Sequence, residues 1–378
     1  MDNNFSPSRP NRKQIPLICR LLSLRLRRRL KATRWHISEN RSNQLKLFLY
    51  HFRNGDSYAA GRLGIEIFDL RDCPPSGFFY AGRAGRKDGI VFHDEHWIAK
   101  YPRTTRDLTG KHLPLHTSSP ISEYLGSHIY HLLGIPVHET VLGYREGKIV
   151  CACKDFTWPN KRLFEFKMLK NSLSDDEEGF SSAPSDGESI YLPDVLSAIE
   201  LSPVLRSIPG VRERFWDMFV IDAFIKNPDR NNGNWGVLYS PDGTYELAPV
   251  YDNGSSLFSK RSASLATRRL DSPDELEQDA FGTNVSCYRL PSINNPKGIP
   301  IHPFSYMEST HNPDLDAAVV RFAERVDLAA IDELIDSIPE EAYGIILMPD
   351  PVRTSHKTLL RKRYEEGILP VYRRITTG

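Results

Sequence analysis

Short alternating runs of apolar and polar residues predict a β-rich segment between residues 63 and 156. Two such runs, at residues 78–80 and 90–92, flank a glycine-rich turn, and a third covers residues 97–100. Two further runs alternate around Glu146 and Gly147, a pattern typical of a β-hairpin. We therefore expect a small sheet in this part of the chain.

Helical periodicity dominates the rest of the chain. One helix interrupts the predicted strands, with apolar residues on one stripe from Ile121 to Leu132 and an end at Gly134 before Pro136. Further helices are predicted at residues 211–226, 314–325, 328–338 and 354–366. Inside this helical half, strands at 235–239 and 245–247 are joined by a Ser-Pro-Asp-Gly turn, which predicts a hairpin.

The composition is that of an ordinary soluble globular protein. The chain has 378 residues, of which 40% are apolar and 26% charged, and this excludes collagen-like, fully disordered and membrane-embedded classes. No transmembrane segment is predicted, because Arg20 and Arg25 interrupt the most apolar stretch, at residues 15–26. Five cysteines without a Cys-x-x-Cys pair favour a reducing, cytoplasmic setting, with secretion as an effector left open.

Charge is distributed unevenly along the chain. Residues 1–45 carry 11 Lys+Arg against two acidic residues and form a basic extension. Four interpretations stay open: a solvated, disordered tail, a contact with nucleic acid or an anionic surface through residues 9–34, a transit peptide, and a wrongly assigned start. Residues 171–189 hold six Asp+Glu and no Lys or Arg, which predicts a mobile acidic loop.

Three polar residues in the second half have the spacing of a phosphotransfer site. Asp229 and Asn234 show the five-residue offset of a kinase catalytic loop, and Asp252 follows the predicted hairpin. Phosphoryl transfer needs a carboxylate that faces the acceptor hydroxyl and two oxygen ligands for Mg²⁺. Since the hairpin returns the chain, Asp252 is expected to lie beside Asn234.

The first half supplies the other parts of such a site in the right order. Gly82 and Gly85 lie in the glycine-rich turn, whose backbone N–H groups can approach phosphates. Lys100 ends a strand, and Glu123 near the start of the next helix is placed to orient it. Taken singly, each feature is ordinary, because strand lysines are usually exposed and a first-turn glutamate favours the helix dipole. These features follow one another along the chain in the order found in phosphotransfer sites, and this order predicts ATP binding.

Four segments carry a resemblance to a known family: residues 122–135 (SEYLGSHIYHLLGI), 221–236 (IDAFIKNPDRNNGNWG), 247–256 (LAPVYDNGSS) and 359–370 (LLRKRYEEGILP). From about residue 77 to the C-terminus the chain resembles the HipA-like serine/threonine protein kinases, and most closely their CtkA-like branch. The resemblance implies an α+β, two-lobed protein-kinase-like fold. Its β-rich, nucleotide-binding N-lobe would cover residues 46–157, and its mainly helical C-lobe residues 158–378.

The same resemblance implies a role for each candidate residue in an ATP- and Mg²⁺-dependent protein kinase. Asp229 would be the catalytic base, with Lys100 and Glu123 completing the catalytic set, and Asn234 and Asp252 would bind Mg²⁺. ATP would contact Gly82, Gly85, Lys100 and the hinge residues Lys154, Asp155 and Phe156.

Regulation and partners follow from the resemblance less directly. The glycine-rich turn has no serine, although HipA is inactivated by phosphorylation of a serine there, so autophosphorylation is expected instead at Ser255, Ser256 or Ser259. A protein substrate is expected, and a HipB-like antitoxin is a plausible partner, as in toxin–antitoxin pairs.

Two other classes of function stay open. A small-molecule phosphotransferase of the aminoglycoside or choline kinase type uses a similar Asp and Asn pair, but commonly has His where this chain has Asn227. An ATP-binding regulatory scaffold would have lost Asp229, Asn234 or Asp252, and all three are present. In a variant of the scaffold hypothesis, the basic N-terminus contacts nucleic acid.

Overall fold

The computed structural model describes residues 64–378 except 79, 81–84, 107–112, 175–189 and 378. The basic extension at residues 1–45, Gly82 and most of the acidic stretch therefore lie outside the described residues. No helix in the described part of the chain has the length and apolar character needed to cross a membrane.

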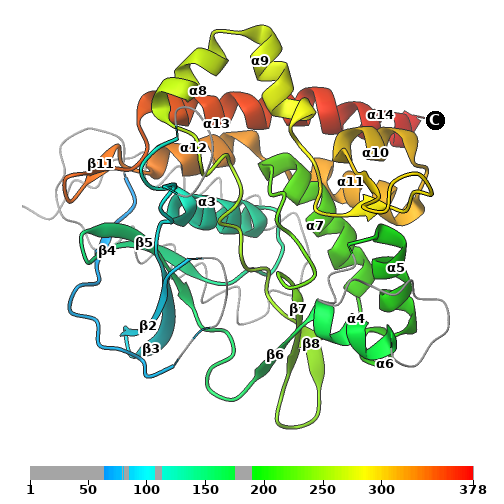
Figure 1. Cartoon of the computed structure of the whole chain (residues 1–378), viewed down its shortest axis with the longest axis horizontal. Coiled ribbons are helices and arrows are strands. Elements are labelled where there is room, and N and C mark those ends of the chain that lie inside the picture. The colour runs from blue at the N-terminus through cyan, green and yellow to red at the C-terminus, as the bar shows by residue number, and fades with distance from the viewer. Residues whose placement is uncertain (1–63, 79, 81–84, 107–112, 175–189, 378) are drawn as a thin grey trace, which may run out of the picture. The chain divides into compact units, whose positions relative to one another are not determined.

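A five-stranded sheet forms the first part of the described chain (Figure 1). The strand order is β1-β4-β5-β3-β2, with β1 parallel to β4 and the other pairs antiparallel. The bounds are β1 (Phe68–Asp69), β2 (Lys87–Phe92), β3 (Glu95–Lys100), β4 (Thr140–Arg145) and β5 (Lys148–Lys154). The predicted strands at 90–92 and 97–100 and the hairpin around Gly147 are confirmed.

Both faces of the sheet are buried, because side chains of β5 alternate between two hydrophobic clusters. Val150 and Ala152 pack with Trp97 and Ala99 in a small cluster on one face. Cys151 and Cys153 point to the other face, into the main core. The sheet is thus covered on both sides, and the thiol face lies toward the rest of the molecule.

The prediction of a strand at residues 78–80 was wrong for the described residues Phe78 and Tyr80, which lie in no strand. The chain instead approaches β2 through Pro75, which makes an isolated bridge with Ile90. Prolines have no N–H, so Pro74 and Pro75 cannot donate to the hydrogen bonds that would extend this pairing. The aromatic side chains gave the run the appearance of a strand.

Helix α3 (Ser119–Leu132) lies between the sheet and the helical part (Figure 1). Ten of its 14 residues are buried, since it contacts β4 and β5 on one side and α12 on the other. Gly126 allows the loop after β8 to approach, because a Cβ there would lie 2.8 Å from the Cβ of Asn253. This close approach brings the two parts of the predicted site together.

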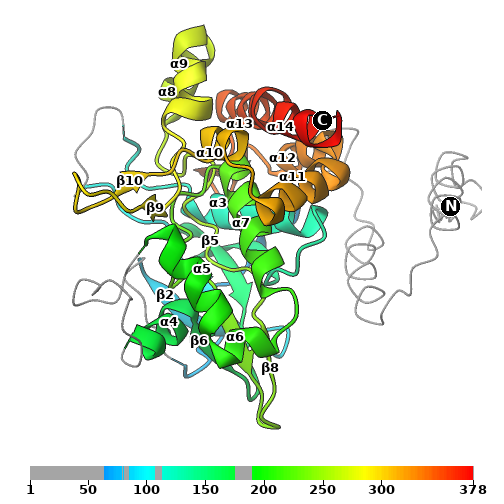
Figure 2. The same cartoon turned by 90° about the vertical axis from the view of Figure 1, so that its right-hand side faces the viewer.

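Helices surround α7 in the second part of the chain (Figure 2). The helices are α4 (Phe166–Ser174), α5 (Leu192–Leu201), α6 (Pro203–Ser207), α7 (Val211–Ile225), α8 (Ala263–Leu270), α9 (Pro273–Glu277), α10 (Pro303–Ser309), α11 (Pro313–Arg325), α12 (Leu328–Ser337), α13 (Asp350–Lys362) and α14 (Leu369–Thr377), with π-helical turns at Gln278–Gly282 and Arg363–Ile368. Twelve of the 15 residues of α7 are buried, so this helix is the centre of the main core.

Short strands complete the helical part. β6 (Arg162–Glu165), β7 (Gly236–Tyr239) and β8 (Tyr245–Leu247) form an antiparallel sheet of three, which confirms the predicted hairpin. Two-stranded pairs are made by β9 (Arg289–Leu290) with β10 (Ile299–Pro300) and by β11 (Glu341–Ala342) with β12 (Ile345–Ile346). The prediction of a loop was wrong for residues 171–174, because α4 continues to Ser174, and residues 175–189 lie outside the described residues.

The predicted helix at 354–366 is confirmed as α13 and the turn after it, and two of its basic residues are buried. Arg363 is fully buried and donates to the backbone carbonyls of Phe224, Asp279 and Ala280. His356 on the same helix is also buried. Burial lowers the pKa of His356 to about 3, and the positive charges of Arg261 and Arg363 act in the same direction.

We expect His356 to make the fold sensitive to acid. An unfolded histidine has a pKa of about 6.5, so below that pH the unfolded chain binds a proton that the folded chain excludes. The free energy of unfolding should therefore fall as the pH drops from about 6.5 toward the folded pKa of about 3. Urea titrations should show a weaker pH dependence in His356→Gln than in wild type. The exposed His302→Gln is the matched control, and equal slopes in all three proteins would contradict the expectation.

Candidate active site

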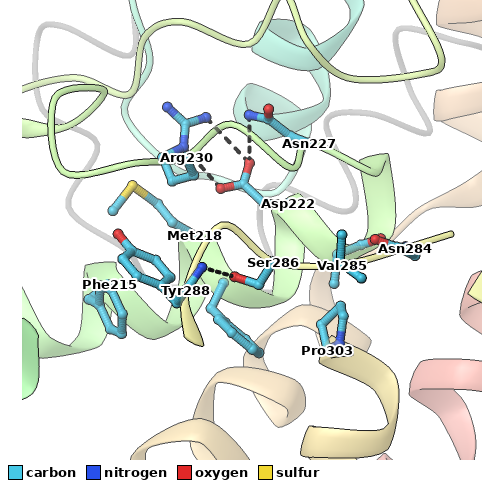
Figure 3. A pocket seen from close by; sticks show the side chains of 12 residues that line it. Phe215, Met218, Asp222, Asn227, Arg230, Asn284, Val285, Ser286, Tyr288 and Pro303 are labelled. Atoms are coloured by element: carbon cyan, nitrogen blue, oxygen red, sulfur yellow. Dashed lines mark hydrogen bonds and ion pairs between the residues drawn. The ribbon is translucent and has the colours of Figure 1, made fainter. Parts of the chain in front are cut away.

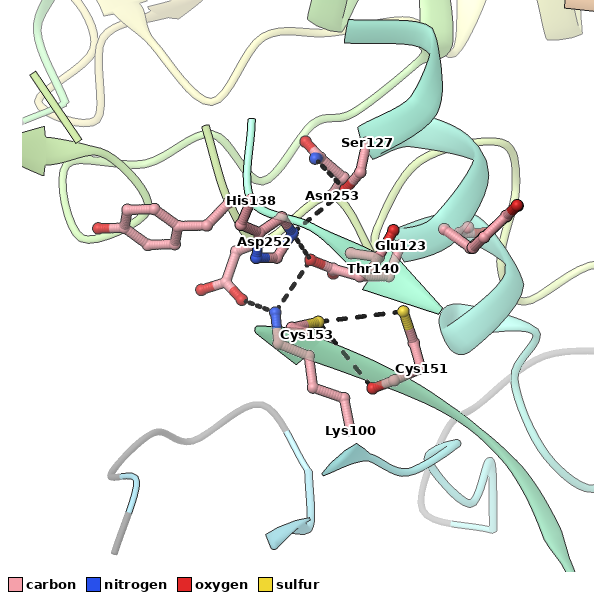
Figure 4. Close-up of polar contacts among 12 residues, drawn as sticks. Lys100, Glu123, Ser127, His138, Thr140, Cys151, Cys153, Asp252 and Asn253 are labelled. Atoms are coloured by element: carbon pink, nitrogen blue, oxygen red, sulfur yellow. Dashed lines mark hydrogen bonds and ion pairs between the residues drawn. The ribbon is translucent and has the colours of Figure 1, made fainter. Parts of the chain in front are cut away.

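Lys100 joins the sheet to the loop after β8. Its Nζ lies 3.0 Å from Oε1 of Glu123 on α3 and also contacts Oδ1 of Asp252 (Figure 4). Lys100 is the last residue of β3, Glu123 is buried, and Asp252 follows the hairpin of β7 and β8. Three residues predicted from separate motifs are therefore in direct contact.

The charges of this group stabilise one another. Burial alone would lower the pKa of Lys100, but Asp252 and Glu123 raise it well above its usual range. Burial would raise the pKa of Glu123, but Lys100 and His138 hold it below its usual range. For Asp252, burial likewise acts upward, and Lys100 lowers the pKa. The lysine is therefore protonated and both carboxylates are ionised at neutral pH.

Asp229 lies at the turn after α7, with its carboxylate held by neighbours. Its Oδ1 accepts from Nδ2 of Asn231 at 3.1 Å, and its Oδ2 lies 3.4 Å from the hydroxyl of Ser255. Asn234 donates from Nδ2 to the backbone carbonyl of Asp229 at 2.6 Å. The side chains of Asp229 and Asn234 are thus fixed relative to each other, as the predicted roles require.

Arg230 connects the catalytic loop to the segment that carries Asp252. It is buried and forms an ion pair with Asp222, with Nε to Oδ2 at 2.9 Å (Figure 3). Its NH1 donates to the carbonyl of Asn234 at 2.9 Å and also to the carbonyl of Tyr251. One guanidinium therefore holds the residues on either side of the hairpin together.

Asp222 supports this arrangement from within α7. It accepts a hydrogen bond from the hydroxyl of Tyr130 at 2.8 Å. It also accepts one from Nδ2 of Asn227 at 3.2 Å (Figure 3). The nitrogens of Arg230 and both carboxylate oxygens of Asp222 thus have partners, which a buried ion pair needs if it is not to destabilise the fold. Through these contacts Asp222 supports the catalytic loop.

The oxygens of Asn234 and Asp252 fit a magnesium ion. Asn234 uses its amide nitrogen toward Asp229, and Asp252 uses Oδ1 toward Lys100. No hydrogen bond among the described residues occupies Oδ1 of Asn234 or Oδ2 of Asp252. Carboxylate and amide oxygens are the hard donors that Mg²⁺ prefers. These two residues can therefore hold Mg²⁺, and the metal would neutralise charge on the bound phosphates.

The predicted nucleotide contacts are only partly described. Gly82 lies outside the described residues, and Gly85 has φ 96°, a left-handed conformation that glycine adopts without strain. The backbone N–H groups of Lys154 and Asp155 already donate to Glu139 and His96. Of the three predicted hinge residues, this leaves the backbone N–H of Phe156 to contact the adenine of ATP. The nucleotide roles of these residues stay predictions.

The hinge is tied to the glycine-rich turn. Tyr80 donates from its hydroxyl to Oδ2 of Asp155 at 2.7 Å. The side chain of Lys154 turns away to Glu95, at 2.8 Å, and to Glu139, at 3.5 Å. Tyr80, which lies just before the glycine-rich turn, is therefore anchored to the hinge.

The three serines predicted as autophosphorylation sites differ in environment. Ser256 is fully buried and donates to the carbonyls of Ser122 and Asn253. Ser259 is buried as well. Ser255 is partly exposed, and its hydroxyl faces the carboxylate of Asp229. Of the three, Ser255 has the accessibility and the neighbour that an acceptor hydroxyl requires.

His138 is a site residue that sequence reasoning missed. It is buried, and its Nε2 lies 3.1 Å from Oε1 of Glu123 and 3.2 Å from the hydroxyl of Ser127 (Figure 4). Ser127 in turn accepts from Nδ2 of Asn253, which contacts Arg230. This series of hydrogen bonds links the ion pair of Lys100 and Glu123 to the catalytic loop. No local pattern around His138 marks it, because its partners are distant in sequence.

Comparison with known proteins decides the family. The serine/threonine-protein kinase CtkA of Helicobacter pylori is 33% identical over 270 residues, which cover 70% of this chain and 77% of that protein. The chain belongs to the CtkA family of serine/threonine-protein kinases.

A solved structure supports the kinase fold of this CtkA family member. The crystal structure of a Helicobacter pylori proinflammatory kinase CtkA matches with a TM-score of 0.71 and 28% identity, over 82% of this chain and 99% of that one. The predicted two-lobed, HipA-like fold class is thereby confirmed. A chain of the HipA, HipB and operator DNA complex of Shewanella oneidensis matches with a TM-score of 0.40 and 14% identity, over 86% of this chain and 72% of that one. That match is too distant to support an argument, and no family model matches the sequence.

Proposed function

We propose that this protein transfers the γ-phosphoryl group of ATP, in the presence of Mg²⁺, to serine or threonine hydroxyls of protein substrates. Asp229 accepts the proton of the acceptor hydroxyl, and Lys100 binds nucleotide phosphates. Asn234 and Asp252 hold the metal. Glu123 and His138 orient the lysine, and Arg230 keeps the two metal-binding residues in register.

One contact carries most of this proposal. The Nζ of Lys100 touches both Glu123 and Asp252, which are separated by more than a hundred residues. A cation between an orienting glutamate and a metal-binding aspartate is the arrangement that active protein kinases require. An ordinary surface lysine on a strand would face solvent and would not lie between two carboxylates.

The residues perform the transfer by positioning and by charge. The acceptor oxygen attacks the γ-phosphorus, the bond from that phosphorus to the bridging β–γ oxygen breaks, and the acceptor proton moves to Asp229. ADP then carries the leaving oxygen. Lys100 offsets negative charge on the phosphates, and the metal, when bound, neutralises charge that develops on the oxygens. The hydrogen bond from Asn231 keeps the carboxylate of Asp229 in one orientation.

The choice of acceptor is tested by comparing different classes of acceptor in the same two assays. ADP release and label from [γ-³²P]ATP should be followed with a generic protein substrate, with an aminoglycoside and with choline. We expect label in serine or threonine of the protein and no stimulation of ADP release by the small molecules. Stimulation by a small molecule alone would favour the small-molecule phosphotransferase that the sequence left open.

Autophosphorylation is proposed at Ser255, because its hydroxyl lies 3.4 Å from Oδ2 of Asp229. Phosphopeptide mapping after incubation with MgATP should find phosphate on Ser255 in wild type. The Ser255→Ala variant should lose that phosphopeptide and should still phosphorylate an added protein substrate. Ser256→Ala serves as the neighbouring control. Phosphate on Ser256 or Ser259, with Ser255 unmodified, would contradict the assignment.

Partners and location stay predictions. A HipB-like antitoxin, a toxin or effector role and a cytoplasmic location follow from the resemblance and the composition alone. The nucleic-acid or anionic-surface contact was predicted for residues 9–34, which lie outside the described residues. Deletion of residues 1–45, followed by salt-dependent binding to DNA and RNA, tests that contact directly.

A further inference from the structure

Two cysteines lie behind the catalytic lysine, on the thiol face of β5. Cys151 and Cys153 are both buried, and their sulfurs are 3.9 Å apart (Figure 4). In the sequence this pair suggests core packing, since no other metal ligand lies nearby along the chain. The structure adds two ligands from other elements, Glu123 of α3 and His138 of the segment before β4.

Three of the four side chains form one cluster, and Cys151 lies beside it. A carboxylate oxygen of Glu123, a ring nitrogen of His138 and the sulfur of Cys153 all lie within 4.8 Å of one another. The closest of these pairs, His138 Nε2 and Glu123 Oε1, is separated by 3.1 Å. Cys151 supplies the second sulfur at 3.9 Å from the first.

These separations are close to those of a tetrahedral zinc site. Zinc binds sulfur at about 2.3 Å and imidazole nitrogen at about 2.0–2.1 Å, so tetrahedral ligand atoms lie about 3.3–3.8 Å apart. The sulfur pair and the histidine–glutamate pair already fall near that range. Cys151 is not part of the group whose ligand atoms all lie within 4.8 Å of one another, so its side chain must rotate to complete the site.

The donor set also selects the kind of ion. Two sulfurs and an imidazole favour zinc and cadmium, whereas Mg²⁺ prefers oxygen ligands. Mg²⁺ at Asn234 and Asp252 would therefore not compete for this cluster. Binding would release the two thiol protons to solvent and would involve no electron transfer.

We propose that Glu123, His138, Cys151 and Cys153 form an inhibitory binding site for a thiophilic divalent cation such as Zn²⁺. The ion takes the carboxylate of Glu123, which Lys100 contacts in the structure. A dication at this position also repels the lysine ammonium. Lys100 then loses the group that orients it, and phosphate transfer stops. The inhibitory effect rests on the proposed kinase function, whereas the binding itself does not.

The ion enters past Lys100 and Asp252. The four ligands are buried, but the neighbouring side chains of Lys100 and Asp252 are 16% and 27% exposed. An ion that reaches the cluster from this side must pass the place where Lys100 meets the phosphates. Prior binding of MgATP is therefore expected to slow metal binding.

Cadmium titration of the full chain tests the site without any assay of activity. Cadmium–thiolate bonds absorb in the ultraviolet, so wild type should develop this absorbance with a stoichiometry of one ion. Cys153→Ala should bind about ten- to a hundred-fold more weakly or lose the absorbance, a loss at least as large as that for removing a supporting group. Cys73→Ala, which changes a partly exposed thiol in the same sheet region, should bind as wild type does.

Phosphate transfer at buffered free Zn²⁺ concentrations completes the test. Each protein is compared with its own zinc-free activity, and wild type and Cys73→Ala should be inhibited while Cys153→Ala resists. If Cys153→Ala does not fold, Cys151→Ala replaces it with the same expectation. No absorbance in wild type, or unchanged absorbance in the Cys153 variant, overturns the site. Normal cadmium binding with equal zinc sensitivity in all proteins overturns the inhibitory role alone.

Discussion

Replacement of Asp229 by asparagine is expected to lower kcat for phosphate transfer on the order of 10²–10⁴-fold, the usual contribution of a positioned general base. Asparagine keeps the shape of the side chain and the hydrogen bond from Ser255, but it cannot accept the acceptor proton at neutral pH. The affinity for ATP should stay unchanged, because Lys100, Asn234 and Asp252 are untouched. Steady-state kinetics with a protein substrate and equilibrium binding of ATP measure the two effects separately.

The matched control for this variant is Asp242→Asn. Asp242 lies in the exposed turn between β7 and β8, where its carboxylate accepts hydrogen bonds from Thr244. The chemical change is the same, and the position belongs to the same hairpin that precedes the metal-binding segment. A kcat of Asp229→Asn near that of Asp242→Asn would contradict the assignment of Asp229 as the base.

Replacement of Asp222 by alanine is expected to reduce the free energy of unfolding by about 3–5 kcal/mol, as for other broken buried ion pairs. Arg230 is only 3% exposed, and without Asp222 its charge stays in the interior without a counter-charge. Burial lowers the pKa of Arg230, but Asp222 raises it above its usual range, so the arginine stays charged. Tyr130 and Asn227 lose a partner as well.

Urea unfolding of Asp222→Ala and Glu246→Ala compares a buried pair with an exposed one. Glu246 pairs with Lys161 at the surface of the three-stranded sheet, and such pairs contribute about 0–1 kcal/mol. We expect a large shift of the unfolding midpoint for the first variant and a small one for the second. Similar small shifts would show that Arg230 finds compensation elsewhere, and the described role of the ion pair would be wrong.

The sequence predicted those parts of the site that local patterns encode. Lys100 at a strand end and Glu123 near the start of a helix are visible as positions in elements whose periodicity is clear. Asp229 and Asn234 are visible through their spacing, and Asp252 through the hairpin before it. The order of these features along the chain is enough to place them in one family, and contact between them follows from the family's fold.

Other parts depend on contacts that no local pattern reveals. His138 becomes a site residue only because α3 brings Glu123 to it, and the thiol face of β5 acquires ligands in the same way. Arg363 appears in the sequence as one member of a basic helix. In the structure it is buried and donates hydrogen bonds to the carbonyls of Phe224 and Asp279. Residues 78–80 resemble a strand because aromatic residues favour strands. The two prolines before them lack the N–H groups needed to extend the pairing, and this prevents a strand from forming at the described residues of this run.

The central claim is that one site, built from both halves of the chain, performs Mg²⁺-dependent phosphate transfer from ATP. The most direct test is the transfer of label from [γ-³²P]ATP to a protein acceptor by wild type and by Asp252→Asn, with ATP binding measured in parallel. We predict Mg²⁺-dependent label in wild type and its loss in Asp252→Asn, because this residue is proposed to bind the metal and contacts Lys100. Undiminished transfer by Asp252→Asn, or the absence of ATP binding by wild type, would contradict it.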